Sequence, residues 1–472
     1  MIPITVRAAV KAANGEYKGN PEKIITGVFT DSRRWEENGL FAAIPGENTD
    51  GHLFVGELVS KGCVCLVSKE EYFIPGTVFV KNTKRAVYDI AAYYRNEIIP
   101  AVKVIAITGS VGKTTVKDMT GLVLNAQYNT YVTKGNSNSL LGVPVSVMSV
   151  NKEDEYAVLE LGMSERGEIA ALSKLVKPSV SIITNIGSSH LEALDSRENL
   201  IKEKFDILSG MEKQSGNVNV NVNANVNPNV NANADFNVVI LDGDSEYEYS
   251  LKNKLYNKTV YCGITNGDSD FRAENIQAFD GKTVFDAVWG NSRQRVVLPA
   301  EGLHNVKNSL YAFAAGILCK TEPGKAAEAL ERFSPTGDRQ RIYIKNGITV
   351  IADCYNASPE SMKAAFAVLG SKPGRKIAVL GDMLELGDLE NRFHADNALL
   401  AAETADIIIF VGSFASLCKS ALRDRENVYA FDTENKHEAA ALLGSLLKPG
   451  DIILFKGSRR IHIDDIIKEA AL

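Results

Sequence analysis

The sequence predicts an α/β protein with two or three domains. Its 472 residues exceed the usual length of a single domain. Short apolar runs rich in β-branched residues alternate with helical patterns, and after residue 335 this alternation favours a mostly parallel, doubly wound sheet. The composition, with 45% hydrophobic and 23% charged residues, is typical of a globular protein with a sizeable core.

The net charge, the hydropathy and the cysteines of the chain indicate which partners and which cellular location to expect. The net charge of −6 gives no electrostatic reason to expect nucleic acid or an anionic membrane as a partner. No apolar run approaches membrane-spanning length, and the first residues lack a signal-peptide core, so we expect no membrane insertion and a cytoplasmic location. The six cysteines show no metal-ligand spacing, which favours reduced thiols.

The first hundred residues mix short strands and helices. Residues 30–54 form two polar loops around a predicted strand at 40–44, and a solvated loop pair is the default interpretation of that pattern. A further strand is predicted at 77–80 and a helix at 83–96, leading into the next part of the chain.

A phosphate site is predicted where a strand, a glycine turn and a helix follow one another. Residues 104–107 read as a buried strand, and residues 113–127 read as a helix. Backbone N–H groups, the positive helix end and the Lys113 charge would face an anion, and the Thr114 hydroxyl is where a phosphate-bound Mg²⁺ is usually held. The standard loop has a glycine where Ile107 stands, so an ordinary tight turn is the alternative. The predicted loop comprises Gly109, Ser110, Val111, Gly112, Lys113, Thr114 and Thr115.

One strand-end carboxylate after the phosphate loop is a candidate metal ligand, and two further polar residues follow it along the chain. Glu160 ends a strand predicted at 156–163, which is where ligands bind in an α/β sheet. His190 follows a second strand, and Lys204 lies on an amphipathic helix at 198–208. A structurally paired glutamate, a satisfied loop histidine and a surface lysine are the alternatives.

The middle of the chain holds a compositional repeat and a predicted run of strands. Asparagine occupies every odd position from 217 to 233, and we expect residues 216–234 to form a mobile surface loop with no catalytic part. Short antiparallel strands are predicted over 250–300, with turns at 266–268 and 280–282. A loop then runs into a helix of small apolar residues at 301–316.

The last third of the chain repeats a strand–loop–helix pattern. Polar loops follow the predicted strands, and strand carboxyl ends form the expected binding edge of such a sheet. The predicted strands are 348–352, 376–380, 407–411 and 451–455. The polar loops are 353–359, 380–387 and 455–459.

The motifs of these loops together resemble the Mur ligases and their folylpolyglutamate synthetase relatives. The shortened phosphate loop T-G-S-V-G-K-T-T is joined, in the family's order, by D-S-R, D-G-H, G-N-S-N-S, E-L-G-M, T-N-I-G-S-S-H, G-L-H-N, T-G-D-R, D-C-Y-N-A-S-P and L-G-D-M-L-E-L-G. The resemblance covers nearly the whole chain apart from the asparagine repeat. On these motifs the chain is identified as a member of the Mur ligase family.

The resemblance implies three domains. Residues 1–100 would be a small α/β domain binding a UDP-muramoyl peptide, residues 101–334 a central P-loop ATPase-like domain with a parallel sheet, and residues 335–472 a Rossmann-like doubly wound domain binding an incoming dipeptide. It also implies an ATP- and Mg²⁺-dependent amide ligase that joins D-alanyl-D-alanine to UDP-N-acetylmuramoyl-tripeptide through an acyl phosphate, working as a monomer. The alternatives are a sister ligase adding the third residue, a folylpolyglutamate synthetase, or a non-catalytic nucleotide-binding protein on the same scaffold.

The resemblance also assigns roles to residues. Beside the phosphate loop, ATP would meet Asn305 at the adenine, Arg339 at the phosphates and Asp353 at the ribose. The metal ligands would be Thr114, Glu160, His190 and Lys204, the last as a carbamate. The UDP substrate would meet Ser32, Gly46, Asp50, His52, Asn136 and Asn138. The dipeptide would meet Asn356 and Ser358. Ser139 and Cys354 depart from the asparagine and alanine that the family usually has at these positions.

Overall fold

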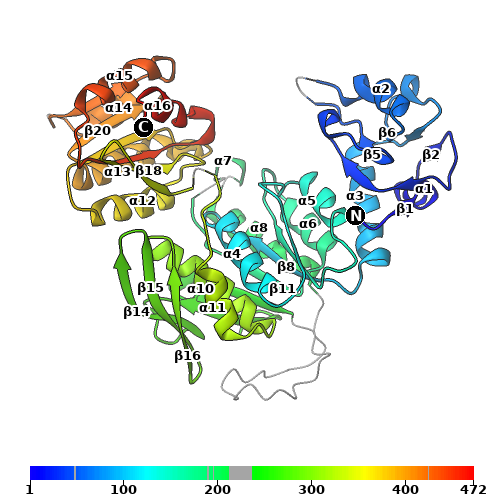
Figure 1. Cartoon of the computed structure of the whole chain (residues 1–472), viewed down its shortest axis with the longest axis horizontal. Coiled ribbons are helices and arrows are strands. Elements are labelled where there is room, and N and C mark those ends of the chain that lie inside the picture. The colour runs from blue at the N-terminus through cyan, green and yellow to red at the C-terminus, as the bar shows by residue number, and fades with distance from the viewer. Residues whose placement is uncertain (47–48, 189–190, 195, 212–236, 338, 424) are drawn as a thin grey trace.

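The computed structural model describes residues 1–46, 49–188, 191–194, 196–211, 237–337, 339–423 and 425–472. The expectations for His190 and for the 216–234 repeat lie outside these ranges. The described strands form three groups along the chain (Figure 1), with the central group between the N-terminal and C-terminal ones. The predicted three-part α/β class is thereby confirmed. We propose domain limits at 1–100, 101–334 and 335–472, because the strands of each sheet lie within one of these intervals.

The N-terminal group is built on a five-stranded sheet that is parallel except at one edge. Its order is β2 (Glu16–Tyr17), β7 (Thr77–Phe79), β6 (Val64–Val67), β5 (Gly39–Ala42) and β4 (Gly27–Phe29). The helices are α1 (Val6–Ala13), α2 (Val55–Ser60) and α3 (Thr83–Tyr93), and a small second sheet pairs β1 (Ile4–Thr5) with β3 (Ile24–Ile25). The strand expected at 40–44 and the helix expected at 83–96 are therefore present.

In the nine-stranded central sheet, β8 (Lys103–Thr108) lies between β11 (Val180–Ile183) and β10 (Tyr156–Glu160). β9 (Thr130–Val132) forms one edge. Helix α4 (Lys113–Asn125) packs on α10 (Leu303–Leu318), and both cover the apolar side chains of β8. The all-parallel neighbours of β8 explain its continuous apolar run, since such strands are buried on both faces.

The far half of this sheet differs from the prediction. β13 (Lys258–Gly263) runs parallel to β12 (Val238–Asp242) and to β14 (Phe271–Phe279), so the turn at 266–268 joins parallel strands and is not a hairpin. The Asp244 carboxylate binds the N–H groups of residues 264–266 and turns the chain over the strand end. The antiparallel prediction is confirmed for β14, β15 (Lys282–Trp289) and β16 (Ser292–Leu298), which are longer than expected.

The C-terminal sheet is doubly wound, as predicted, with two strands that the sequence did not reveal. Its order is β17 (Arg341–Lys345), β18 (Ile348–Asp353), β22 (Ile452–Lys456), β19 (Lys376–Gly381), β20 (Ile407–Val411) and β21 (Val428–Phe431). Its main helices are α12 (Pro359–Ser371), α13 (Glu390–Thr404), α14 (Ala415–Ala421), α15 (Lys436–Leu446) and α16 (Asp464–Glu469). β17 is antiparallel and joins β18 through Asn346-Gly347, both with positive φ, as a tight hairpin requires.

Both ends of α12 hold the C-terminal group against the central one. At its start, Glu360 accepts a hydrogen bond from the Ser188 hydroxyl, 2.8 Å away. Just past its end, the Lys372 ammonium pairs with the carboxylates of Glu301 and Asp280, at 2.5 and 2.7 Å. Within the ranges given above, no helix is long and apolar enough to span a membrane.

Candidate active site

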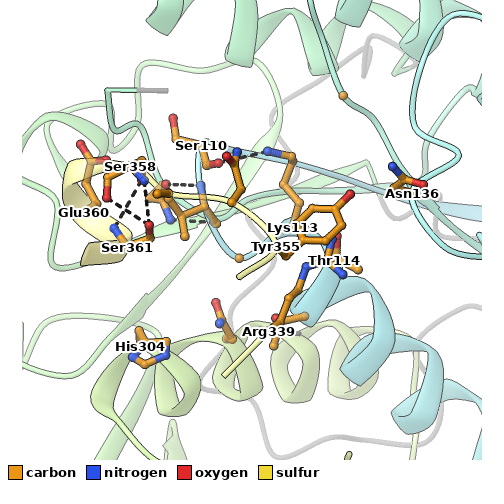
Figure 2. Close-up of a pocket in the computed structure, with 18 of the residues that line it drawn as sticks. Ser110, Lys113, Thr114, Asn136, His304, Arg339, Tyr355, Ser358, Glu360 and Ser361 are labelled. Carbon is orange, nitrogen blue, oxygen red and sulfur yellow. Dashed lines mark hydrogen bonds between the residues drawn. The ribbon is translucent and has the colours of Figure 1, made fainter. Parts of the chain in front are cut away.

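A cavity lies between the central and C-terminal groups and brings their polar loops together (Figure 2). Its walls come from the carboxyl end of the central sheet, the start of α10 and the start of α12. Most predicted ATP and dipeptide residues line it: Ser110, Val111, Gly112, Lys113, Thr114, Thr115, Asn305, Arg339, Asp353, Asn356 and Ser358. Glu160, Asn136 and Asn138 line it as well.

The phosphate loop can form only because two of its residues are glycines. Gly109 has a φ of +144°, and a β-carbon there would lie 2.0 Å from the Thr184 hydroxyl oxygen. Gly112 has a φ of +86°, and a β-carbon there would lie 2.7 Å from the Asn308 side-chain oxygen. Asn185 holds the loop between them, accepting from the Val111 N–H and donating to the Val111 carbonyl at 3.0 and 2.9 Å. The loop is therefore a rigid cradle, as an anion site requires.

Lys113 bends back over this cradle. Its ammonium donates to the carbonyls of Gly109 and Ser110, at 2.7 and 3.1 Å. Burial lowers the pKa of Lys113, and the nearby Glu160 carboxylate opposes that shift. A phosphate bound in the loop would supply the anionic partner that these neutral carbonyls do not.

Glu160 is the centre of an oxygen-rich cluster beside the loop. The Thr114 hydroxyl donates to one carboxylate oxygen and the Asn138 amide donates to the other, each at 2.8 Å. Glu160 is 1% exposed and ends β10, one strand away from the phosphate loop. Hydroxyl and carboxylate oxygens are the ligands Mg²⁺ prefers, so this pair fits a phosphate-bound magnesium ion.

Lys204 is buried, contrary to its alternative interpretation as a surface lysine. It lies on α8 (Arg197–Phe205) and is fully inaccessible, and its amine has no hydrogen-bond partner in the described part of the chain. Burial lowers its pKa well below the usual value, and the positive charge of Lys113 lowers it further. An uncharged amine near the phosphate loop is the form that can react with carbon dioxide.

The start of α10 carries a polar group that the sequence revealed only in part. The Asn305 amide donates to the Glu301 carbonyl at 2.8 Å and to the Gln340 side-chain oxygen at 2.7 Å. The His304 ring also contacts that Gln340 oxygen, at 2.7 Å. Gln340 directly follows the predicted Arg339, so its place in the T-G-D-R-Q segment was the available signal.

The C-terminal loops complete the wall. The Arg339 guanidinium lies over the Tyr355 ring, 3.5 Å from its centre. Asp353 accepts from the Lys456 ammonium at 2.6 Å and from the Gln340 N–H at 3.2 Å. Ser358 caps α12 with its side chain and is 4% exposed. Tyr355 and Lys456 are site residues that the sequence did not identify, although they lie in the polar loops at 353–359 and 455–459.

Four predicted UDP-substrate residues lie apart from this cavity, in the N-terminal group: Ser32, Gly46, Asp50 and His52. His52 is fully buried, its ring contacts Asp50 at 2.6 Å, and it accepts a hydrogen bond from the Ser68 N–H at 3.0 Å. His52 therefore holds the Asp50 loop in place from beneath.

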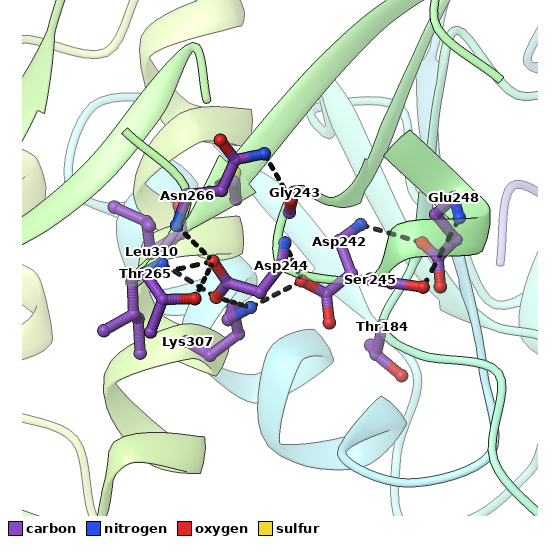
Figure 3. A network of polar contacts seen from close by, with 12 residues as sticks. Thr184, Asp242, Gly243, Asp244, Ser245, Glu248, Thr265, Asn266, Lys307 and Leu310 are labelled. Carbon is purple, nitrogen blue, oxygen red and sulfur yellow. Dashed lines mark hydrogen bonds and ion pairs between the residues drawn. The ribbon is translucent and has the colours of Figure 1, made fainter. Parts of the chain in front are cut away.

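A second polar network anchors α10 to the sheet (Figure 3). The Lys307 ammonium pairs with the carboxylates of Asp242 and Asp244 at the end of β12. Glu248 lies beneath them, fully buried, and accepts the Asp242 N–H at 2.8 Å. Burial, with the charge of Asp242, raises the pKa of Glu248 to about 8. This network fixes the helix that carries Asn305.

Glu248→Gln should remove a pH dependence of stability. Between the ordinary pKa of 4.5 and about 8, folded Glu248 holds a proton that the unfolded chain has released, so wild-type stability falls as the pH rises through this window. Glutamine does not titrate. We expect the Tm difference, variant minus wild type, to increase from pH 5 to pH 8. Glu246→Gln, exposed on the same short helix, is the control, and a constant difference for Glu248→Gln would contradict this assignment.

Comparison with known proteins covers the whole chain. Three family descriptions match in succession: "Mur ligase family, catalytic domain" at residues 24–111, "Mur ligase middle domain" at 107–316, and "Mur ligase, glutamate ligase domain" at 339–459. The UDP-N-acetylmuramoyl-tripeptide–D-alanyl-D-alanine ligase of Bacillus subtilis is 35% identical, covering 99% of this chain and 98% of its own.

Solved structures agree with this similarity. The MurF crystal structure from Acinetobacter baumannii matches with a TM-score of 0.86 and 30% identity, covering 99% of this chain and 98% of that one. The MurF ligase of Thermotoga maritima, solved in complex with ADP, matches with a TM-score of 0.79 and 23% identity over 94% and 96% of the two chains. The second similarity shows the fold alone.

Proposed function

This chain belongs to the Mur ligase family, and we propose that it is the ATP-dependent ligase that joins D-alanyl-D-alanine to UDP-N-acetylmuramoyl-tripeptide in peptidoglycan precursor synthesis. The observation that carries this proposal is the shared cavity. It brings the phosphate loop of the central group to the D-C-Y-N-A-S-P loop of the C-terminal group. That loop and L-G-D-M-L-E-L-G distinguish the enzyme from a sister ligase and from a folylpolyglutamate synthetase.

The first half of the reaction activates a carboxylate. The N–H groups of the phosphate loop and the Lys113 ammonium hold the ATP phosphates and offset the charge that develops during phosphoryl transfer. The terminal carboxylate of the tripeptide forms a bond to the γ-phosphorus, and the bond to ADP breaks. In this proposal Asn305 would meet the adenine, Asp353 the ribose and Arg339 the phosphates.

The second half forms the amide. The dipeptide amine attacks the acyl phosphate carbon, a tetrahedral intermediate forms, and phosphate leaves with the electrons of the broken C–O bond. Asn356 and Ser358, which line the cavity near the start of α12, would orient the dipeptide. Closure of the C-terminal group on the central one protects the acyl phosphate from water.

Magnesium fits the residues present. Thr114 and Glu160 supply hard oxygen ligands beside the phosphate loop, and His190 is a further candidate outside the described ranges. Lys204 would join them as a carbamate: its neutral nitrogen bonds to the carbon of carbon dioxide and one proton is released, which converts an unpartnered buried amine into an anionic oxygen ligand. Bound there, Mg²⁺ would neutralise phosphate charge.

The UDP contacts, the oligomeric state and the cellular location complete the proposal. The UDP end of the acceptor would lie against Ser32, Gly46 and the Asp50 loop supported by His52, with Asn136 and Asn138 nearer the phosphate loop. We also propose that the enzyme works as a monomer, as the family resemblance implies. The substrates are cytoplasmic precursors, so we place the enzyme in the cytoplasm.

A substrate panel tests the function. Purified protein is given ATP, Mg²⁺ and UDP-N-acetylmuramoyl-tripeptide ending in lysine or in diaminopimelate, and phosphate release and product mass are measured. We expect product with D-alanyl-D-alanine and at least one of the two acceptors. Transfer of a single amino acid to the UDP-muramoyl dipeptide, or of glutamate to a folate, without dipeptide ligation would contradict the proposal.

A further inference from the structure

The carboxylate of Glu360 lies in the cavity wall but has no part in the two half-reactions proposed for the ligase. Glu360 lies in the first turn of α12 and lines the cavity with Ser358 (Figure 2). One of its oxygens accepts the Ser188 hydroxyl hydrogen bond at 2.8 Å. The other oxygen, Oε2, is buried and has no hydrogen-bond partner among the residues that the structure describes.

The surroundings hold this carboxylate beside the phosphate loop. A β-carbon at Gly187 would lie 2.7 Å from the Glu360 carboxyl carbon, so the carboxylate packs directly on the Gly187 backbone. The Gly187 N–H in turn donates to the Ser110 hydroxyl of the phosphate loop at 2.9 Å. One residue, Gly187, therefore separates the Glu360 carboxylate from the phosphate loop.

Two other carboxylates in the cavity are already satisfied. Both oxygens of Glu160 accept hydrogen bonds, from Thr114 and Asn138. Both oxygens of Asp353 accept as well, from Lys456 and Gln340. Glu360 differs, because no described lysine or arginine pairs with it and Oε2 accepts nothing. A buried carboxylate oxygen without a donor is costly, so this position favours a cationic donor from a ligand.

We propose that Glu360 binds the amino group of the incoming dipeptide and accepts its proton during amide formation. This inference rests on the proposed ligase function. Of the substrates of that reaction, the dipeptide brings the α-ammonium group that must lose protons to form the amide, whereas ATP brings phosphates that a carboxylate would repel. The lysine or diaminopimelate side chain of the acceptor also carries an ammonium group, but that group does not react. An α-amino group with a pKa of about 8 is mostly protonated at neutral pH, so a nearby proton acceptor is needed.

Glu360 Oε2 first accepts one proton from the ammonium group, and the neutral amine nitrogen then forms a bond to the acyl carbon. The C–O bond to the phosphoryl group breaks, and phosphate leaves with the bonding electrons and takes up the second N–H proton as hydrogen phosphate. Protonated Glu360 returns its proton to solvent when the product departs. Ser188 holds the other oxygen and keeps Oε2 directed at the amine, so Ser188 is a positioning residue.

Assays with two different nucleophiles distinguish proton acceptance by Glu360 from the phosphoryl-transfer half of the reaction. Glu360→Gln is assayed for ligation of D-alanyl-D-alanine and, separately, for hydroxamate formation with hydroxylamine, a nucleophile that is already neutral at pH 7. We expect kcat/KM for the dipeptide to fall about 100-fold, as for loss of a general base. Hydroxamate formation should stay within about threefold of wild type, since acyl phosphate formation does not need Glu360.

Ser188→Ala is the matched control, because it removes the hydrogen bond between the central and C-terminal groups and leaves Glu360 Oε2 in place. We expect it to lower dipeptide ligation much less than Glu360→Gln. The proposal is overturned if Glu360→Gln ligates the dipeptide normally, if it loses both nucleophile reactions equally, or if Ser188→Ala reproduces its full defect. Failure of the wild type to ligate the dipeptide would instead refute the proposed function.

Discussion

Lys113→Ala should lower kcat at least about 100-fold while the fold stays intact. Among the described residues, the Lys113 ammonium donates to two loop carbonyls, at 2.7 and 3.1 Å, and forms no ion pair with a buried carboxylate. The lost quantity is the positive charge that would meet the transferring phosphoryl group. Steady-state phosphate release measures the rate, and circular dichroism with thermal unfolding measures the fold.

Lys152→Ala serves as the control for the loss of a lysine, because that side chain is exposed and far from the cavity lining. It should keep the wild-type rate. Near-normal ligation by Lys113→Ala would show that the loop is an ordinary strand-to-helix turn. Loss of folded protein in Lys113→Ala alone would show that the lysine serves the core and not a phosphate.

Lys204→Ala should lower kcat at least about 10-fold, and a small carboxylate should restore part of the rate. Lys204 is fully buried without a hydrogen-bond partner among the described residues, and its lowered pKa favours the neutral amine, which is the form that binds carbon dioxide. Formate or acetate would place an oxygen anion where the carbamate stood. Removing bicarbonate from the wild type should slow it in the same direction.

A direct measurement does not depend on turnover. With ¹³C-labelled bicarbonate, the wild type should show a carbamate carbonyl NMR signal that is missing from Lys204→Ala. Lys202→Ala is the matched control: it lies two residues earlier on α8, is exposed, and should keep both the signal and the rate. An inactive Lys204→Ala that formate does not rescue, with no labelled signal in the wild type, would refute the carbamate.

The local motifs were readable from the sequence because each is made of consecutive residues. Residues 104–115 contain their own strand, glycines and helix start, so the phosphate loop needed no distant partner to be recognised. Glu160 was identified as a strand-end carboxylate for the same reason. The C-terminal alternation of strands and helices likewise predicted its doubly wound sheet, although the short β17 and β21 were missed.

Burial, strand direction and contacts between separate motifs could not be read from the sequence, because they depend on tertiary packing. The helix pattern around Lys204 allowed a surface lysine, and only the burial of α8 excludes it. The parallel direction of β13 was hidden because Asp244, whose carboxylate turns the chain there, acts on residues about 20 positions away. Gln340 became a site residue only when β17 and α10 came together.

The sequence by itself determined the α/β class, the phosphate loop and the order of the polar loops, because these depend on periodicity and on neighbouring residues. Only the tertiary structure decided which loops share a cavity. Glu360 and Ser188 are 172 residues apart, and their contact exists because the start of α12 lies beside the loop that follows β11 at the carboxyl end of the central sheet. Neither the Glu360 Oε2 atom nor the Lys204 amine has a hydrogen-bond partner in the described part of the chain, and this is a property of that packing, since whether a polar atom finds a donor or acceptor depends on everything folded around it.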